Sequence, residues 1–174
     1  MSDLESVMRF TLPPQPSGRS VVALLVIVMS VWVPLMAAGL TSTVCRNPTY
    51  NDSKRLGYCD FSLGIAQIAN GVFENHKTSS LYMDRGILLA NAGKVQDARR
   101  DMQRALELAS FGNPRAILLE TLNPPKTSPI IRNPSNPAPW VPRLIMRAEQ
   151  RDASEVAKQI WYEVLTEALN ESES

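Results

Sequence analysis

Residues 21–40 form a run of twenty amino acids without a single charged side chain, VVALLVIVMSVWVPLMAAGL. At 1.5 Å per residue, a helix of this length spans about 30 Å, the thickness of the hydrocarbon core of a bilayer. Arg19 and Arg46 bracket the run, and a proline such as Pro34 is tolerated in membrane helices. We therefore predict an N-terminal tail over residues 1–19 and a transmembrane helix over residues 20–40 that contacts the lipid bilayer.

Two other interpretations of this run remain open. The first is a cleaved signal peptide with the small residues 37–39 at its cleavage site. The apolar run is longer than the 7–15 residues typical of a signal-peptide core, which favours an uncleaved anchor. The second is a lipoprotein attachment at Cys45, which is disfavoured because Val44 stands where a small residue normally precedes the modified cysteine.

The flanking charges do not decide the orientation of the transmembrane helix. The N-terminal side carries Arg9 and Arg19, and the other side carries Arg46, Lys54 and Arg55. Two basic residues against three do not support an N-terminus on the cytoplasmic side by the positive-inside rule.

The two cysteines of the chain, Cys45 and Cys59, give a separate indication of location. They lie fourteen positions apart, and a disulfide closing such a loop would stabilise it by roughly 3 kcal/mol. Disulfides persist in oxidising compartments, so we predict a Cys45–Cys59 bond and a C-terminal domain on the periplasmic side of a bacterial inner membrane. The alternative is two free thiols in a reducing cytosol.

The balance of charges excludes one class of partner. The chain of 174 residues has 18 basic and 17 acidic side chains, a formal net charge of +1. A surface that binds nucleic acid usually has a clear basic excess, so no nucleic-acid partner is expected.

Beyond the membrane segment, the pattern predicts a tether and then a helical domain. Residues 41–59 are polar and lack periodicity, which is typical of a tether. Apolar residues at helical spacing follow from Asp60, the expected N-cap, and the helical domain is predicted over residues 60–123.

Within this domain, residues 79–112 read as two helices joined near Gly93. Small residues, Gly86 and Ala98, fall where two antiparallel helices could cross closely. This pattern resembles a tetratricopeptide repeat, a helix–turn–helix unit of 34 residues. Arg85 departs from it, since the family usually has an aliphatic residue there, and the closing proline comes late. The matching positions are Tyr82, Gly86, Leu89, Gly93, Ala98, Met102 and Ala105.

The resemblance implies protein–protein contact through the face made by the first helix of the repeat. Carried over by position, this predicted binding face consists of Ser80, Met83, Ile87, Ala90 and Asn91. A single repeat does not bury its own faces, so a partner is expected to complete the domain. The alternative is an amphipathic helical hairpin unrelated to the family.

The remaining residues predict an extended segment and a second hairpin. Seven prolines fall between positions 124 and 142, which predicts a stiff extended linker. Residues 143–170 predict a C-terminal helical hairpin with Ser154 as N-cap of its last helix, before a tail at 171–174. The predicted fold is therefore all-α: one N-terminal transmembrane helix and a small helical-hairpin domain, similar to a tetratricopeptide repeat, with a proline-rich extended segment.

No arrangement of residues predicts catalysis. His76 is the only histidine and has no cysteine or carboxylate pair near it, so no metal site is expected. The acidic and basic residues of 97–107 have the spacing of intrahelical ion pairs. We expect no enzymatic activity and no cofactor.

The sequence thus predicts a membrane-anchored adaptor or accessory subunit that mediates protein–protein interaction in a larger membrane complex. The alternative is an envelope assembly factor or chaperone that binds clients transiently. An enzyme, the third class, would need residues from another chain.

Overall fold

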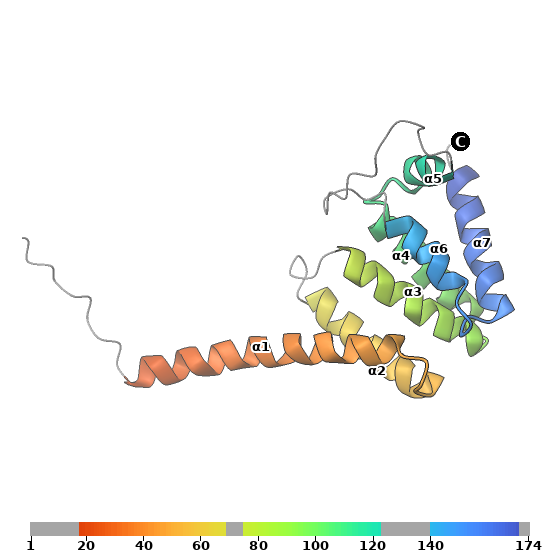
Figure 1. The fold of residues 1–174 in the computed structure, drawn as a ribbon. Helices are drawn as coiled ribbons and strands as arrows, with labels where there is room; N and C mark the ends of the chain where they lie inside the picture. The colour runs from red at the N-terminus through yellow and green to blue at the C-terminus, as the bar shows by residue number, and fades with distance from the viewer. Residues whose placement is uncertain (1–17, 69–74, 123–139, 171–174) are drawn as a thin grey trace, which may run out of the picture. The chain divides into compact units, whose positions relative to one another are not determined.

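A computed structural model describes residues 18–68, 75–122 and 140–170, and these residues form helices joined by turns, with no strand among them (Figure 1). The all-α prediction is therefore confirmed. The chain divides into two compact units, residues 1–34 and residues 35–174. The helices are α1 (Gly18–Arg46), α2 (Asp52–Ile68), α3 (Asn75–Asn91), α4 (Val95–Ala109), α5 (Pro114–Leu122), α6 (Trp140–Ala148) and α7 (Glu155–Asn170).

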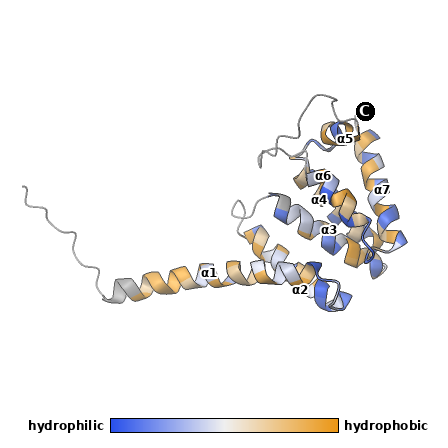
Figure 2. Ribbon diagram, viewed as in Figure 1, coloured by the Kyte–Doolittle hydropathy of each residue, from blue (hydrophilic) through white to orange (hydrophobic). Residues whose placement is uncertain are grey.

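Helix α1 contains the uncharged run. Its portion Val22–Arg46 contains an 18-residue window with a mean hydropathy of 2.4 and is long and apolar enough to cross a membrane, as predicted. In the part of α1 that belongs to the first unit, large apolar side chains such as Leu24 and Trp32 are exposed. Figure 2 shows this part of the helix as mostly hydrophobic. Ser30 is accommodated because its hydroxyl donates to the carbonyl of Val26 at 2.8 Å within the same helix.

The predicted tether over residues 41–59 is helical at both of its ends. Helix α1 continues to Arg46, six residues beyond the predicted end at residue 40. The hydroxyls of Thr41, Ser42 and Thr43 donate to carbonyls three or four residues earlier, so these polar residues do not interrupt the helix.

Helix α2 begins at Asp52 rather than at Asp60, the N-cap expected from the sequence. The side chain of Asn51 accepts a hydrogen bond from the backbone N–H of Lys54 at 2.8 Å and thereby caps the helix. Asp60 lies inside α2, and its carboxylate accepts a hydrogen bond from Arg85. The turn between the two helices is therefore short, from 47 to 51.

Helices α3 and α4 form a hairpin that crosses at the small residues. A Cβ atom on Gly86 would lie 2.9 Å from Cγ of Met102 and 3.3 Å from the carbonyl oxygen of Ala98. Ala98 is itself fully buried. The two backbones come this close because neither position carries a large side chain.

Gly93 ends the first helix of this hairpin in a left-handed conformation with φ of 76°. The N–H of Lys94 donates to the carbonyl of Leu89 at 2.8 Å, and the N–H of Gly93 donates to the carbonyl of Ala90 at 2.9 Å. This pair of bonds is the Schellman arrangement, which favours glycine because a side chain would be strained at positive φ.

The C-terminal helices α6 and α7 pack against α3 and α4. Trp161 of α7 is fully buried in the core that these helices share. Ser154 caps α7, as predicted, because its hydroxyl accepts a hydrogen bond from the N–H of Ala157 at 3.2 Å. The core also contains Met102, Ala105, Val141, Leu144, Ile160 and Val164.

The predicted proline-rich linker over residues 124–142 lies mostly outside the described residues. Its last three residues, 140–142, form the first turn of α6 instead of an extended segment. Pro142 is compatible with this turn because the first N–H groups of a helix have no partner within it.

Replacing Gly86 by alanine tests the close crossing of α3 and α4. The added methyl group would press against Met102 and a backbone carbonyl, and overpacking of this kind costs about 1–3 kcal/mol. We expect the free energy of unfolding of G86A to fall, measured by denaturation of the full chain in detergent with circular dichroism.

The matched control is Gly57→Ala in α2, where an added Cβ would meet nothing within 4 Å. Alanine is favoured over glycine inside a helix by about 1 kcal/mol, so this variant should be as stable as the original chain or more stable. A stabilised G86A would contradict the close crossing.

Candidate functional site

The predicted binding face is largely buried in the protein's own core. Met83 and Ile87 are fully buried and Ala90 is 3% exposed, while Ser80 and Asn91 are partly exposed. The predicted face is therefore not an open surface, because α6 and α7 lie against α3.

Asn91 joins this face to the turn before α7. Its side-chain amide donates to the carbonyl of Asp152 at 2.8 Å, and its side-chain oxygen accepts from the N–H of Ser154 at 3.1 Å. The residue predicted to bind a partner thus holds the C-terminal hairpin of the same chain in place.

The positions that match the repeat pattern lie at the interfaces between helices, except for Gly93, which lies exposed in the turn between α3 and α4. Met102 and Ala105 are fully buried, Leu89 is 8% exposed, and Tyr82 is half-buried. The hydroxyl of Tyr82 accepts a hydrogen bond from the side chain of Gln67 at 3.0 Å. These residues therefore have structural contacts within the domain.

Arg85, the departure from the repeat pattern, forms ion pairs that connect three helices. Its guanidinium donates to Asp101 of α4 at 2.7 Å and to Asp60 of α2 at 3.0 Å. The pKa of Arg85 is raised above its ordinary value, and the hydrogen bond with Asp101 is the main cause. An aliphatic residue at this position would leave Asp101, which is buried, without this partner.

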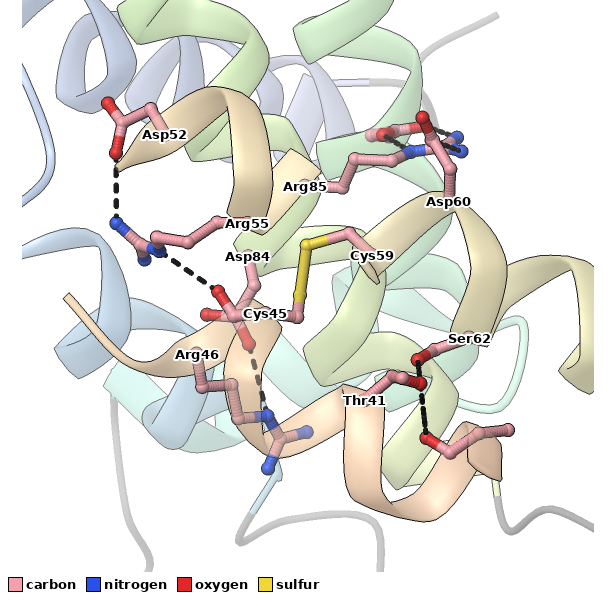
Figure 3. Close-up of a disulfide and its surroundings, with 12 residues drawn as sticks. Thr41, Cys45, Arg46, Asp52, Arg55, Cys59, Asp60, Ser62, Asp84 and Arg85 are labelled. Carbon is pink, nitrogen blue, oxygen red and sulfur yellow. Dashed lines mark hydrogen bonds and ion pairs between the residues drawn. A yellow bond between two sulfur atoms is a disulfide. The ribbon is translucent and has the colours of Figure 1, made fainter. Parts of the chain in front are cut away.

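Cys45 and Cys59 are bonded to each other and are both fully buried (Figure 3). The bond joins the end of α1 to the middle of α2, with 5.0 Å between the two Cα atoms. Leu63, Leu81 and Leu88 pack around it, so the disulfide lies between α1, α2 and α3.

A hydroxyl pair lies one turn further along the same interface. The hydroxyls of Ser62 and Thr41 lie 2.7 Å apart, a hydrogen bond in which either can be the donor (Figure 3), and the hydroxyl oxygen of Ser62 also lies 3.2 Å from the carbonyl oxygen of Ala38. Advancing along α2 from Cys59 to Ser62 therefore means moving back along α1 from Cys45 to Ala38. The two helices run antiparallel here.

Next to the disulfide lies a cluster of charged side chains that we name the polar junction. It consists of Arg46, Arg55, Asp84, Arg147 and Asp152. Arg55 and Asp84 are each only 1% exposed. Buried charges of this kind are tolerated only when they are paired and hydrogen-bonded, so the geometry of their partners is decisive.

The guanidinium of Arg55 in α2 donates hydrogen bonds to three different segments. Its Nε donates to the carbonyl of Cys45 at 3.1 Å, and one Nη donates to Asp52 at 3.2 Å. The other Nη donates to Asp152, in the turn before α7, at 2.8 Å. A single guanidinium therefore connects the end of α1, the start of α2 and the C-terminal hairpin.

Asp84 of α3 is held between two arginines. Arg46, at the end of α1, lies 3.1 Å from one carboxylate oxygen, and Nε of Arg147 donates to the other (Figure 3 shows the pair with Arg46). Burial raises the pKa of Asp84, and the charges of Arg147 and Arg46 oppose that rise.

Arg147 completes the junction through a bidentate pair with Asp152. The two pairs of atoms are 2.8 and 3.0 Å apart, a fork geometry that gives both strength and direction. Burial acts to raise the pKa of Asp152, but the hydrogen bonds and charges of Arg147 and Arg55 outweigh it. The net shift of the pKa of Asp152 is downward.

Sequence reasoning did not identify the polar junction. Its members are spread from position 46 to position 152, and no spacing rule connects them. The one usable signal was Asp84, a carboxylate whose neighbours three or four positions away on the predicted helix include Leu81, Ile87 and Leu88. A charge at such a position requires a buried partner, but the sequence does not say which arginine supplies it.

A surface cavity of about 430 Å³ opens beside the polar junction. It has three arginines and one carboxylate in its lining, so its charge is positive. The lining residues are Arg46, Ser80, Asp84, Arg143, Leu144, Met146, Arg147 and Gln150. Among the residues that the structure describes, no group of three or more histidines, cysteines or carboxylates could hold a metal ion.

Compared with known proteins, the chain matches no family model, no curated protein and no solved structure.

Replacing Asp84 by asparagine tests the polar junction. The change would leave Arg46 without its anionic partner and Arg147 with Asp152 alone. Removing one partner of a buried pair costs about 3–5 kcal/mol. We expect a fall of this size in the free energy of unfolding, measured in detergent by chemical denaturation.

The control is Glu107→Gln, because Glu107 pairs with Arg104 on the exposed side of α4 at 2.8 Å. Exposed pairs contribute about 0–1 kcal/mol. Equal costs for D84N and E107Q would show that the buried pairs contribute no more than a surface pair.

Proposed function

We propose that the protein is a single-pass membrane-anchored adaptor or accessory subunit, which holds a rigid helical domain at a membrane surface for a protein partner. The observation that carries this proposal is α1, where large apolar side chains such as Leu25, Val26 and Met29 are more than half exposed. Apolar surface of this extent favours a lipid environment.

We place the helical domain on the periplasmic side of a bacterial inner membrane. The support for this location is the Cys45–Cys59 bond, because disulfides persist in oxidising compartments. Cys45 and Cys59 are fully buried, which protects the bond from exchange with external thiols.

The likeness of α3 and α4 to a tetratricopeptide repeat is part of the proposal, supported by the crossing at Gly86 and Ala98. The partner, however, would not bind the face predicted from that likeness, since Met83 and Ile87 are buried. We propose instead that the partner binds the positively charged cavity beside the polar junction through an acidic segment. The exposed residues at this cavity are Arg46, Arg143, Met146 and Gln150, and of its two exposed arginines Arg46 is already paired with Asp84.

The alternative function, an envelope assembly factor or chaperone, rests on a groove that receives extended clients. The face on which such a groove would be built is packed against α6 and α7. A resident subunit with a fixed charged surface is therefore the function that this geometry supports better.

Membrane anchoring and orientation are tested together by placing a cysteine at Leu119, which is 45% exposed on α5. The two natural cysteines are bonded, so the new residue is the one free thiol among the described residues. After expression in a bacterium, we expect the L119C protein to resist alkaline extraction from membranes. We also expect a membrane-impermeant maleimide to label it in spheroplasts.

The matched control is Val26→Cys in α1, which should resist the same reagent while the membrane is intact. Labelling of L119C only after the membrane is permeabilised would overturn the orientation. Release of the protein by alkaline extraction would overturn the anchor.

The partner surface is tested by reversing the charge of Arg143. We expect a protein that co-purifies with the original chain from detergent-solubilised native membranes to be lost with R143E, because an acidic segment would be repelled. The control is Arg151→Glu, an exposed arginine outside the cavity, which should retain the partner. Retention by R143E, or equal loss with R151E, would contradict the proposed surface.

A further inference from the structure

Helix α2 has its charges in one half. Asp52, Lys54, Arg55 and Asp60 lie in its first nine residues, and the sequence then has no charged residue from 61 to 73. Figure 2 shows the corresponding change along α2, from a hydrophilic start to a more hydrophobic end. Such a gradient along a helix axis, rather than across its faces, indicates that the two ends have different surroundings.

The contacts with α1 fix which end of α2 lies toward the membrane segment. Cys59 is bonded to Cys45, and Ser62 reaches Ala38 and Thr41. Because the helices run antiparallel where they touch, the residues of α2 beyond Ser62 continue in the direction in which α1 runs back from Ala38, a residue of the uncharged run. The charged half of α2 continues in the opposite direction, toward Arg46.

The uncharged half of α2 exposes apolar side chains. Ile68 is 85% exposed and Phe61 is 45% exposed, whereas Leu63 and Ala66 face the protein and are buried. Gly64, between the two exposed residues, would have nothing within 4 Å of an added Cβ. The exposed residues of this half are therefore apolar except for Gln67, whose amide donates to the hydroxyl of Tyr82.

We propose that residues 61–68 of α2 insert into the membrane interface beside α1, with Phe61 and Ile68 in contact with lipid chains. This inference rests on the proposed role of α1 as the membrane anchor. Ile68 lies six residues beyond Ser62, or up to about 9 Å along the helix axis, and interfacial helices bury their apolar faces about 5–10 Å deep. Helix α2 would thus be a second element, in addition to α1, through which the protein contacts the membrane.

Lipid is favoured over a second protein as the occupant because this surface is continuous with the segment that the membrane already covers. Ala38, which Ser62 contacts, belongs to the uncharged run that we propose as the membrane anchor, so the apolar face of α2 next to it would meet the same medium. The absence of charge over 61–73 matches this medium, since a charged residue there would be costly.

The test uses spin labels on the full chain in vesicles of phosphatidylcholine and phosphatidylglycerol. Ile68→Cys and Phe61→Cys are labelled singly, with Leu25→Cys as the control within α1 and Val156→Cys as the control on the domain surface. Collisions with oxygen, which concentrates in hydrocarbon, are compared with collisions with a water-soluble nickel chelate. We expect the label at 68 to lose most of the nickel collisions seen at 156 and to gain oxygen collisions, with 61 intermediate.

Each outcome has a distinct meaning. Nickel collisions at 68 as frequent as at 156, with position 25 protected, would overturn the insertion of α2 and leave the anchor standing. Nickel collisions at position 25 would overturn the anchor itself. Protection of 68 from both reagents would mean that protein rather than lipid covers this surface, which would also overturn the proposal.

Discussion

The need of two buried ions, Arg55 and Asp84, for charged partners from other segments is the constraint on which the rest of the domain depends. An arginine and an aspartate that are each 1% exposed are tolerated only if every donor and acceptor has a partner. Those partners come from the end of α1, from α2, from α6 and from the turn before α7. These segments must therefore be in place together, and the Cys45–Cys59 bond fixes the first two independently of the charges.

This arrangement determines which surfaces of the domain are filled by the chain itself and which remain exposed. The C-terminal hairpin docks on α3 through the polar junction and through Asn91, so the face that a repeat protein would use is filled by the chain itself. Surface remains at the charged cavity and along the outer face of α2. The adaptor that we propose would present these fixed surfaces to its partner, in contrast to a groove that adapts to many clients.

Sequence reasoning was effective where one local pattern determines the outcome. The uncharged run determines α1, small residues allow the crossing at Gly86, and Ser154 caps α7. It failed where the outcome depends on distant residues. The start of α2 was predicted to be a tether because it is polar and lacks periodicity. It is held in the folded domain by the hydrogen bonds of Arg55 to Cys45 and Asp152, and no local window of sequence contains these partners. The filling of the predicted binding face was missed for the same reason, since α6 and α7 follow sixty or more residues after Ser80.

Hydrogen exchange of the full chain in vesicles, with the disulfide intact and then reduced, measures most directly whether the polar junction and the disulfide make one cooperative unit. The account predicts that amides of α2, from Leu56 to Ala66, exchange as slowly as those of α3 and α4 while the bond is intact. After reduction they should exchange faster, together with amides at the end of α1. Fast exchange in α2 with the bond intact, beside slow exchange in α3 and α4, would show that α2 is tethered without being part of the folded unit and would contradict the account.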